Sequence, residues 1–139
     1  MMTTATGEFE IANWDEQLVQ GEAKGQRLTR ADVTQRFSGG IDGEGHVIWL
    51  MAYRDDGTAR FVGMQHVEGT ISGRRGSAMF ETEGDFDGSQ AKGTWRVVEG
   101  SGAEGWDGIR GEGGFNAPHG STATYSVVIV DSPQNGALD

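Results

Sequence analysis

The residues of this chain best suited to chemistry are aromatic and polar side chains that share the inward face of strand-like segments. Glutamine, threonine and tyrosine can both donate and accept hydrogen bonds, whereas tryptophan and methionine supply apolar contact area. This mixture is typical of a pocket that surrounds a small, largely apolar molecule and orients it through a few hydrogen bonds. The same mixture can instead fill a solid core, so both interpretations stay open. The set is Trp49, Met51, Tyr53, Gln65, Thr82, Trp95 and Tyr125.

No local signature identifies catalytic machinery. The chain has no cysteine, which excludes a disulfide framework, a thiolate metal site and a cysteine nucleophile. Its three histidines are scattered, so we predict no bound metal. A serine, a histidine and an acid could be combined in many ways, but no nucleophile elbow singles out one serine. We therefore predict no cofactor, and the motifs leave open whether the chain is an enzyme.

Two motifs with a formal resemblance to ligand-binding loops are better explained as connections. Residues 100–105 have the glycine spacing of a dinucleotide-binding fingerprint. However, Gly108 would interrupt the helix that should follow, and Glu104 would repel a pyrophosphate. Residues 85–89 begin like a calcium loop but lack its closing glutamate, so a hairpin turn is the better prediction.

Charge and hydropathy exclude several classes of partner. The formal net charge is −10, from 21 acidic and 11 basic residues, so the average field repels nucleic acids and anionic membranes. The basic pair Arg74 and Arg75 sits between two glycines, which indicates a loop tip with two solvated charges. No apolar run approaches the roughly 18 residues of a membrane helix, and the N-terminus lacks the pattern of a secretory signal. We expect a soluble, cytoplasmic protein that binds neither nucleic acid nor membranes.

Apolar residues at every second position predict half-buried strands. In residues 60–71, Phe61, Gln65 and Val67 share the inward parity, and after a turn the same pattern continues over residues 78–86. Residues 47–53, 91–97 and 125–129 alternate in the same way. Two further strands are predicted at residues 8–13, with Phe9 and Ile11 inward, and at residues 29–37. The 24 glycines indicate frequent turns between short elements.

Seven or eight strands without an amphipathic helix predict an all-β fold. A closed antiparallel eight-stranded meander barrel is favoured, because closure removes the exposed strand edges of an open sheet. An interior of this size can be filled by side chains or can hold one small ligand. The single barrel domain is expected to span residues 7–130, with flexible tails at residues 1–6 and 131–139.

Five segments carry a resemblance to a known family. The chain resembles a bacterial domain-of-unknown-function family, number three-two-two-four, from about Gly7 to Val130. This family is similar to the eight-stranded barrels of allene oxide cyclases, and residues 100–113 also resemble a glycine-rich motif of dirigent proteins. The segments are Leu28-Thr29-Arg30-Ala31, Leu50-Met51-Ala52-Tyr53-Arg54, Phe61-Val62-Gly63, Gly93-Thr94-Trp95, and the stretch from Gly100-Ser101-Gly102 to Ile109-Arg110-Gly111-Glu112-Gly113.

The resemblance implies an apolar-ligand cavity but no settled activity, since one fold supports many functions. The chain has Gln65-His66 and Glu81-Thr82 where the family typically has Glu-Arg and Gln-His. At the inward positions 65 and 82, neutral residues thus replace an acid and a histidine, which argues against acid–base chemistry there.

Three functions follow as hypotheses. The first is a barrel that binds a small, largely apolar molecule in its interior, using aromatic contacts together with Gln65, Thr82 and tyrosine hydroxyls. The alternative is a cyclase or isomerase that holds a reactive biosynthetic intermediate in a productive conformation and excludes water. The third is a protein-interaction module. The identity of the ligand and the oligomeric state, including a homo-oligomer, stay open.

Overall fold

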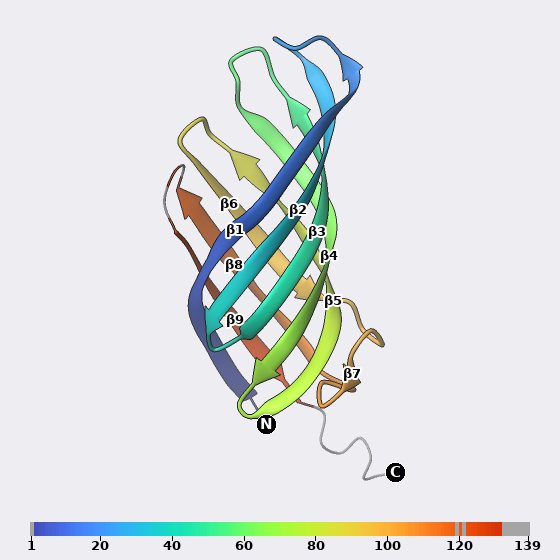
Figure 1. Cartoon of the computed structure of the whole chain (residues 1–139), viewed down its shortest axis with the longest axis vertical. Coiled ribbons are helices and arrows are strands. Elements are labelled where there is room, and N and C mark those ends of the chain that lie inside the picture. The colour runs from blue at the N-terminus through green and yellow to red at the C-terminus, as the bar shows by residue number, and fades with distance from the viewer. Residues whose placement is uncertain (1, 119, 121, 132–139) are drawn as a thin grey trace.

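The computed structural model describes residues 2–118, 120 and 122–131. These residues form strands and the turns between them (Figure 1). None of them lies in a helix, so the described part of the chain has no helical segment that could cross a membrane. The strands are β1 (Met2–Gly21), β2 (Arg27–Gly39), β3 (Asp42–Tyr53), β4 (Ala59–Ile71), β5 (Arg74–Phe86), β6 (Gln90–Val97), β7 (Ala103–Glu104), β8 (Arg110–Pro118) and β9 (Ala123–Val130).

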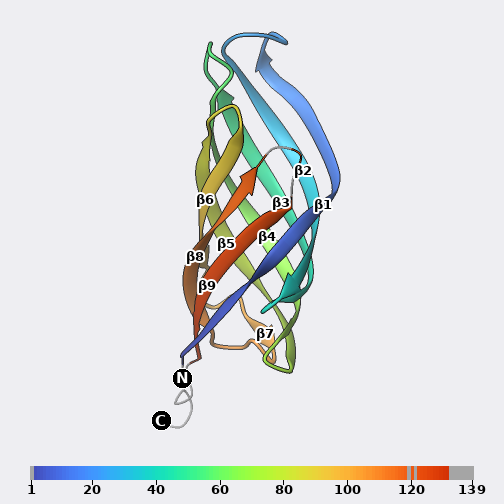
Figure 2. The same cartoon turned by 90° about the vertical axis from the view of Figure 1, so that its left-hand side faces the viewer.

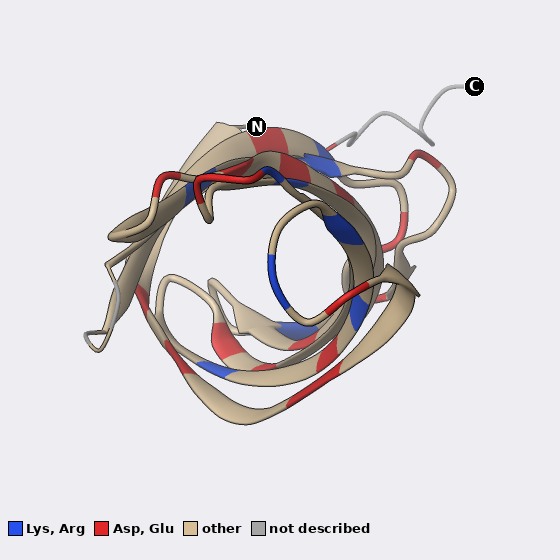
Figure 3. Ribbon diagram, turned by 90° about the horizontal axis from the view of Figure 1, so that it is seen from above, with Lys and Arg blue, Asp and Glu red and all other residues tan. Residues whose placement is uncertain are grey.

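Eight antiparallel strands close into a barrel. Each strand pairs with its neighbours in the chain, except that β6 pairs directly with β8, and the short β7 adds to the edge of β5. Pairing between β1 and β9 completes the ring, which is seen along its axis in Figure 3. The predicted closed eight-stranded meander is therefore confirmed.

Alternation along the strands separates the core from the surface. In β3, Val47, Trp49 and Met51 are buried, whereas Leu50 between them is 46% exposed. Val33 and Phe37 of β2 are buried as predicted, so the strand prediction for this segment is correct. Because side chains of a strand point alternately to its two faces, one parity of every strand fills the barrel.

Glycines inside the strands make room for aromatic rings. A Cβ atom on Gly63 would lie 2.6 Å from Cδ1 of Trp49, and one on Gly93 would lie 2.6 Å from Cε2 of Phe115. Gly45, Gly76 and Gly84 stand in the same relation to Phe37, Trp106 and Phe61. The expectation that glycines mainly separate short elements was thus incomplete: several lie within strands of 8 to 13 residues and accept a ring from a neighbouring segment.

The connection between β6 and β8 packs into the lower end of the barrel. It carries β7 and buries Trp106, whose Nε1 donates a hydrogen bond of 3.0 Å to the carbonyl of Arg74. Ile41, Ile71 and Ile109 are buried in the same core. The glycine-rich stretch at residues 100–105 therefore leads into a packed connection and not into a helix.

Two local predictions were wrong. Residues 2–6, expected in a flexible tail, belong to β1 and pair with β9, because closure of the barrel needs a partner on both sides of β9. Arg74 and Arg75, expected at a loop tip, lie in β5, because Ser72 and Gly73 both adopt positive φ and complete the turn by themselves. Arg74 contacts Asp131 at 2.5 Å. Residues 132–139 of the expected C-terminal tail lie outside the described residues.

Candidate functional site

A cavity of about 830 Å³ occupies the upper part of the barrel. Its walls are mainly aromatic and aliphatic, and the lining includes the buried rings of Phe9, Trp49, Phe61 and Phe115. The complete set of described lining residues is Phe9, Glu10, Ile11, Trp14, Trp49, Met51, Tyr53, Phe61, Phe86, Ala91, Phe115, Ala117, Pro118, Gly120, Thr122 and Ala123.

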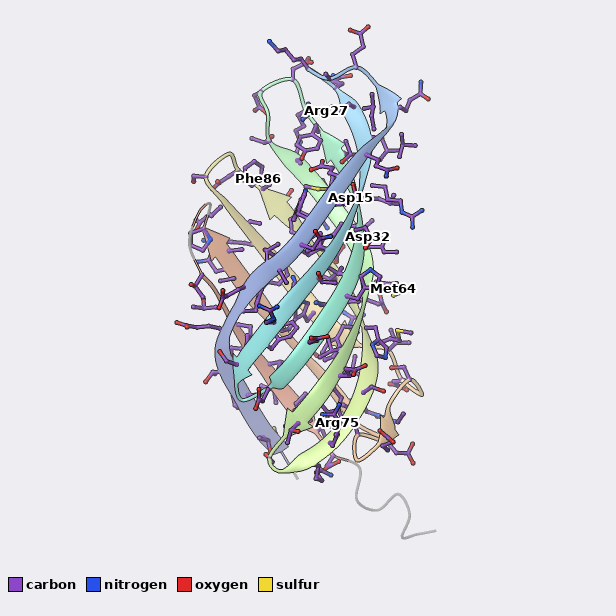
Figure 4. The ribbon with its side chains drawn as sticks, viewed as in Figure 1. Asp15, Arg27, Asp32, Met64, Arg75 and Phe86 are labelled. Carbon is purple, nitrogen blue, oxygen red and sulfur yellow. The ribbon has the colours of Figure 1, made fainter. Side chains whose placement is uncertain are left out.

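The rim of this cavity is uneven. The β1–β2 and β3–β4 hairpins rise above the ends of β6, β8 and β9 (Figures 1 and 2). β1 pairs with β9 only as far as Phe9, whereas it continues along β2 to Gly21. Figure 4 places Arg27 and Phe86 at this upper end, and Arg75 near the lower one. The cavity therefore has one high wall, made by β1, β2 and β3.

An irregularity in β1 decides which side chains face inward on the high wall. The register with β2 shifts between Ile11 and Asn13, so the strand changes parity there. Beyond the shift, Trp14 lies opposite Val33 and Glu16 lies opposite Ala31. Val33 and Ala31 are completely buried, so Trp14 and Glu16 share the inward face of the sheet.

Glu16 is the centre of a group of contacting side chains that we call the rim cluster: Trp14, Glu16, Arg27, Thr29 and Tyr53. Oε2 of Glu16 accepts hydrogen bonds from Oγ1 of Thr29 at 2.6 Å and from the hydroxyl of Tyr53 at 2.8 Å. Oε1 accepts one from Nε1 of Trp14 at 3.0 Å. Three side-chain donors thus hold the carboxylate at the entrance to an apolar cavity.

Tyr53 keeps its proton in this arrangement. Burial raises the pKa of Tyr53 to about 12, the hydrogen bond to Glu16 and the charge of Glu16 act in the same direction, and Arg27 opposes them. The guanidinium carbon of Arg27 lies 3.8 Å from the centroid of the Tyr53 ring. At neutral pH the Tyr53 hydroxyl therefore stays protonated, donates a hydrogen bond to Glu16 and presents its oxygen as an acceptor.

Comparison with known proteins identifies the family of this chain. The model of a family described as "Protein of unknown function (DUF3224)" matches residues 5–128. The chain belongs to the DUF3224 family. The crystal structure of a DUF3224 protein of unknown function from Shewanella oneidensis MR-1 is similar to it, with a TM-score of 0.79 and 23% sequence identity. That similarity covers 94% of this chain and 98% of the other. No curated protein matches significantly.

These findings confirm the predicted family and the barrel fold. A structural likeness at this level of identity concerns the fold alone. The implied relationship to allene oxide cyclases, and the cyclase or isomerase activity that would come with it, stay predictions.

The DUF3224 barrel separates the seven predicted site residues into two groups. Trp49, Met51 and Tyr53 of β3 line the cavity. The other four lie on inward parity as expected, but they are buried and do not line the cavity: Gln65, Thr82, Trp95 and Tyr125. The sequence pattern identified which residues face inward, but not how far down the barrel each one lies.

Tyr125 and Gln65 have structural partners in this DUF3224 chain. The Tyr125 hydroxyl accepts a hydrogen bond from the backbone nitrogen of Ile41 at 2.8 Å and donates to the carbonyl of Ser38 at 2.7 Å, which fixes the turn between β2 and β3. Nε2 of Gln65 donates to Oε1 of Gln35, and both glutamines are buried. These groups are engaged with the protein below the cavity.

The two glutamines permit a direct test of their structural role. Gln65→Leu and Gln35→Leu should each lower the free energy of unfolding by about 1 to 3 kcal/mol, because each change leaves a buried amide without its partner. The double variant should lower the free energy of unfolding by less than the sum of the two single changes, since neither amide is then left unpaired. Urea unfolding of the four proteins measures this coupling. If the two losses of unfolding free energy were strictly additive, the result would contradict the hydrogen bond between Gln35 and Gln65.

The sequence pattern identified Tyr53 but no other member of the rim cluster as a site residue. The first strand was predicted to end at Asn13, whereas β1 continues to Gly21 and includes Trp14 and Glu16. A weak signal was present, since Trp14, Glu16 and Leu18 continue an alternation whose parity differs from that of Phe9 and Ile11 by one residue. A change of parity without glycine or proline gives little indication of a continuing strand.

Proposed function

We propose that this protein binds a small, largely apolar molecule in the upper cavity of its barrel. The observation that supports this best is the cavity itself, whose volume of about 830 Å³ falls within the usual range of ligand pockets. Its aromatic lining offers a large contact area at a low cost in conformational entropy, and the high wall adds a small number of polar groups at the entrance.

Packing below the cavity supports a defined pocket over a channel. Phe115 contacts the rings of Phe9, Phe61 and Trp95, with centroid distances of 5.9, 6.2 and 5.6 Å. This layer separates the cavity from the lower core, where Trp106 is buried. A ligand would therefore enter and leave at the upper end, past the rim cluster.

Titration with N-phenyl-1-naphthylamine, an apolar and uncharged fluorescent dye, tests the proposal. Trp14 and Trp49 line the cavity, so a bound dye should quench tryptophan emission while its own emission rises and saturates at one dye per chain. The unfolded protein in urea serves as the control and should give no saturable signal. Failure of the dye and of a panel of neutral apolar compounds to saturate the folded protein would overturn the proposal.

A further inference from the structure

We propose that the molecule bound in the cavity carries a protonated amine on an apolar body, and that Glu16 binds this amine. The inference rests on the proposed function, because it concerns the chemistry of a ligand in the same cavity. It is carried by three features of the upper end: the free hydrogen-bonding positions, the balance of charge and the aromatic rings.

Apart from the Arg27 guanidinium, the free hydrogen-bonding positions of the rim cluster are acceptors. The donors of Trp14, Thr29 and Tyr53 already point to Glu16. A carboxylate offers about four lone-pair sites. Oε1 of Glu16 accepts one bond from the protein and can accept another, and the oxygen of Tyr53 can accept one as well. A ligand group that binds Glu16 must therefore donate hydrogen bonds, which an amine does and a carboxylate does not.

Charge at the entrance favours a cation. Glu10 is the one charged side chain among the described lining residues, but it has the outward parity of β1 and lies opposite Arg36. The carboxylate on the inward face is that of Glu16, behind Trp14 and Tyr53. Arg27, the one cation in the rim cluster, packs on the Tyr53 ring and donates from Nη1 to the carbonyl of Gly25 at 3.2 Å. With Arg27 engaged by these contacts, Glu16 is the charged group that the rim cluster can offer to a ligand, in a chain whose net charge is −10.

Aromatic rings lie beside the carboxylate. The Trp14 indole is held by its hydrogen bond to Glu16 and lies against the Trp49 indole, with 5.9 Å between the ring centroids. The face of an indole attracts a cation through its quadrupole, most strongly where water is partly excluded. An amine bound to Glu16 would thus meet both an opposite charge and aromatic surface, while its apolar body extends toward Phe61 and Phe115 in the cavity.

Three probes with one chain length and different head groups test the inference. Decylamine, decanol and decanoate should displace N-phenyl-1-naphthylamine from the full-length protein at pH 7, each kept below its micelle concentration. Decylamine should displace the dye at a concentration about tenfold lower than decanol, since a charge-assisted hydrogen bond and a cation–π contact add to the shared apolar contribution. Decanoate should be the weakest competitor.

Two variants of adjacent residues locate the effect. Glu16→Gln should reduce the advantage of decylamine over decanol to about threefold or less, because the amide keeps the size of the side chain but not its charge. Asp15→Asn makes the same change in net charge on an exposed neighbour of the opposite parity, and it should keep the wild-type order. Equal potency of decylamine and decanol on the wild-type protein would overturn the assignment of the amine. So would an equal effect of the two variants. A barrel that binds neither dye nor any of the probes would instead overturn the proposed function.

Discussion

Phe115→Ala should lower the free energy of unfolding by about 3 to 5 kcal/mol, which is the usual cost of removing a phenyl ring from a core. Phe115 is 7% exposed, and its ring centroid lies between 5.6 and 6.3 Å from those of Phe9, Trp49, Phe61 and Trp95. It also covers Gly93, which has no side chain that could move into the vacated space. Denaturant unfolding followed by tryptophan emission measures the change.

The matched control removes an apolar side chain from the outer surface. Leu50→Ala, on the outward face of β3, should change the free energy of unfolding by less than about 1 kcal/mol, since Leu50 is 46% exposed and belongs to no core cluster. If Phe115→Ala costs no more than Leu50→Ala, the aromatic layer does not stabilise the barrel. The cavity would then lack the stable aromatic layer beneath it on which the proposed function depends.

The fold was predictable because alternation is a local property of the chain. Trp49, Met51 and Tyr53 show their common parity within five residues, and the turn at residues 54–58 marks where the strand reverses. Closure followed from the absence of helical patterns and from the tendency of sheets to avoid free edges. The lengths of the strands were less predictable, because glycines such as Gly63 and Gly93 resemble turn residues unless the ring that packs on each is known.

The site was only partly predictable because depth along a barrel is not a local property. Trp49 and Trp95 have the same parity and residue type, yet Trp49 lines the cavity and Trp95 is packed among Phe9, Phe37, Phe80 and Tyr125. Their difference depends on the stagger between strands, which is set by pairing over the whole ring. The inward position of Glu16 depends on the register shift in β1, which can be recognised only from the pairing of β1 with β2.

Ala91→Trp should weaken binding of the neutral dye by at least about tenfold, because the indole would occupy space that the ligand needs. Ala91 is a half-buried residue of β6 that faces inward and lines the cavity beside Phe86 and Ala117. The larger side chain would extend into open volume and not into a close-packed core, so the cost in stability should be small. Dye titration gives the affinity, and thermal unfolding checks that the barrel remains folded.

Ala52→Trp makes the same substitution on the outer face of β3, between the lining residues Met51 and Tyr53. It adds the same indole group to the exposed outer surface of the barrel. Dye affinity should therefore stay within about twofold of wild type. The comparison therefore separates an interior site from adsorption on the wall of the barrel. If Ala52→Trp alters binding and Ala91→Trp does not, the dye binds outside. A loss of affinity confined to Ala91→Trp would place the ligand inside the cavity, which Ala91 lines together with Phe61, Phe86 and Phe115.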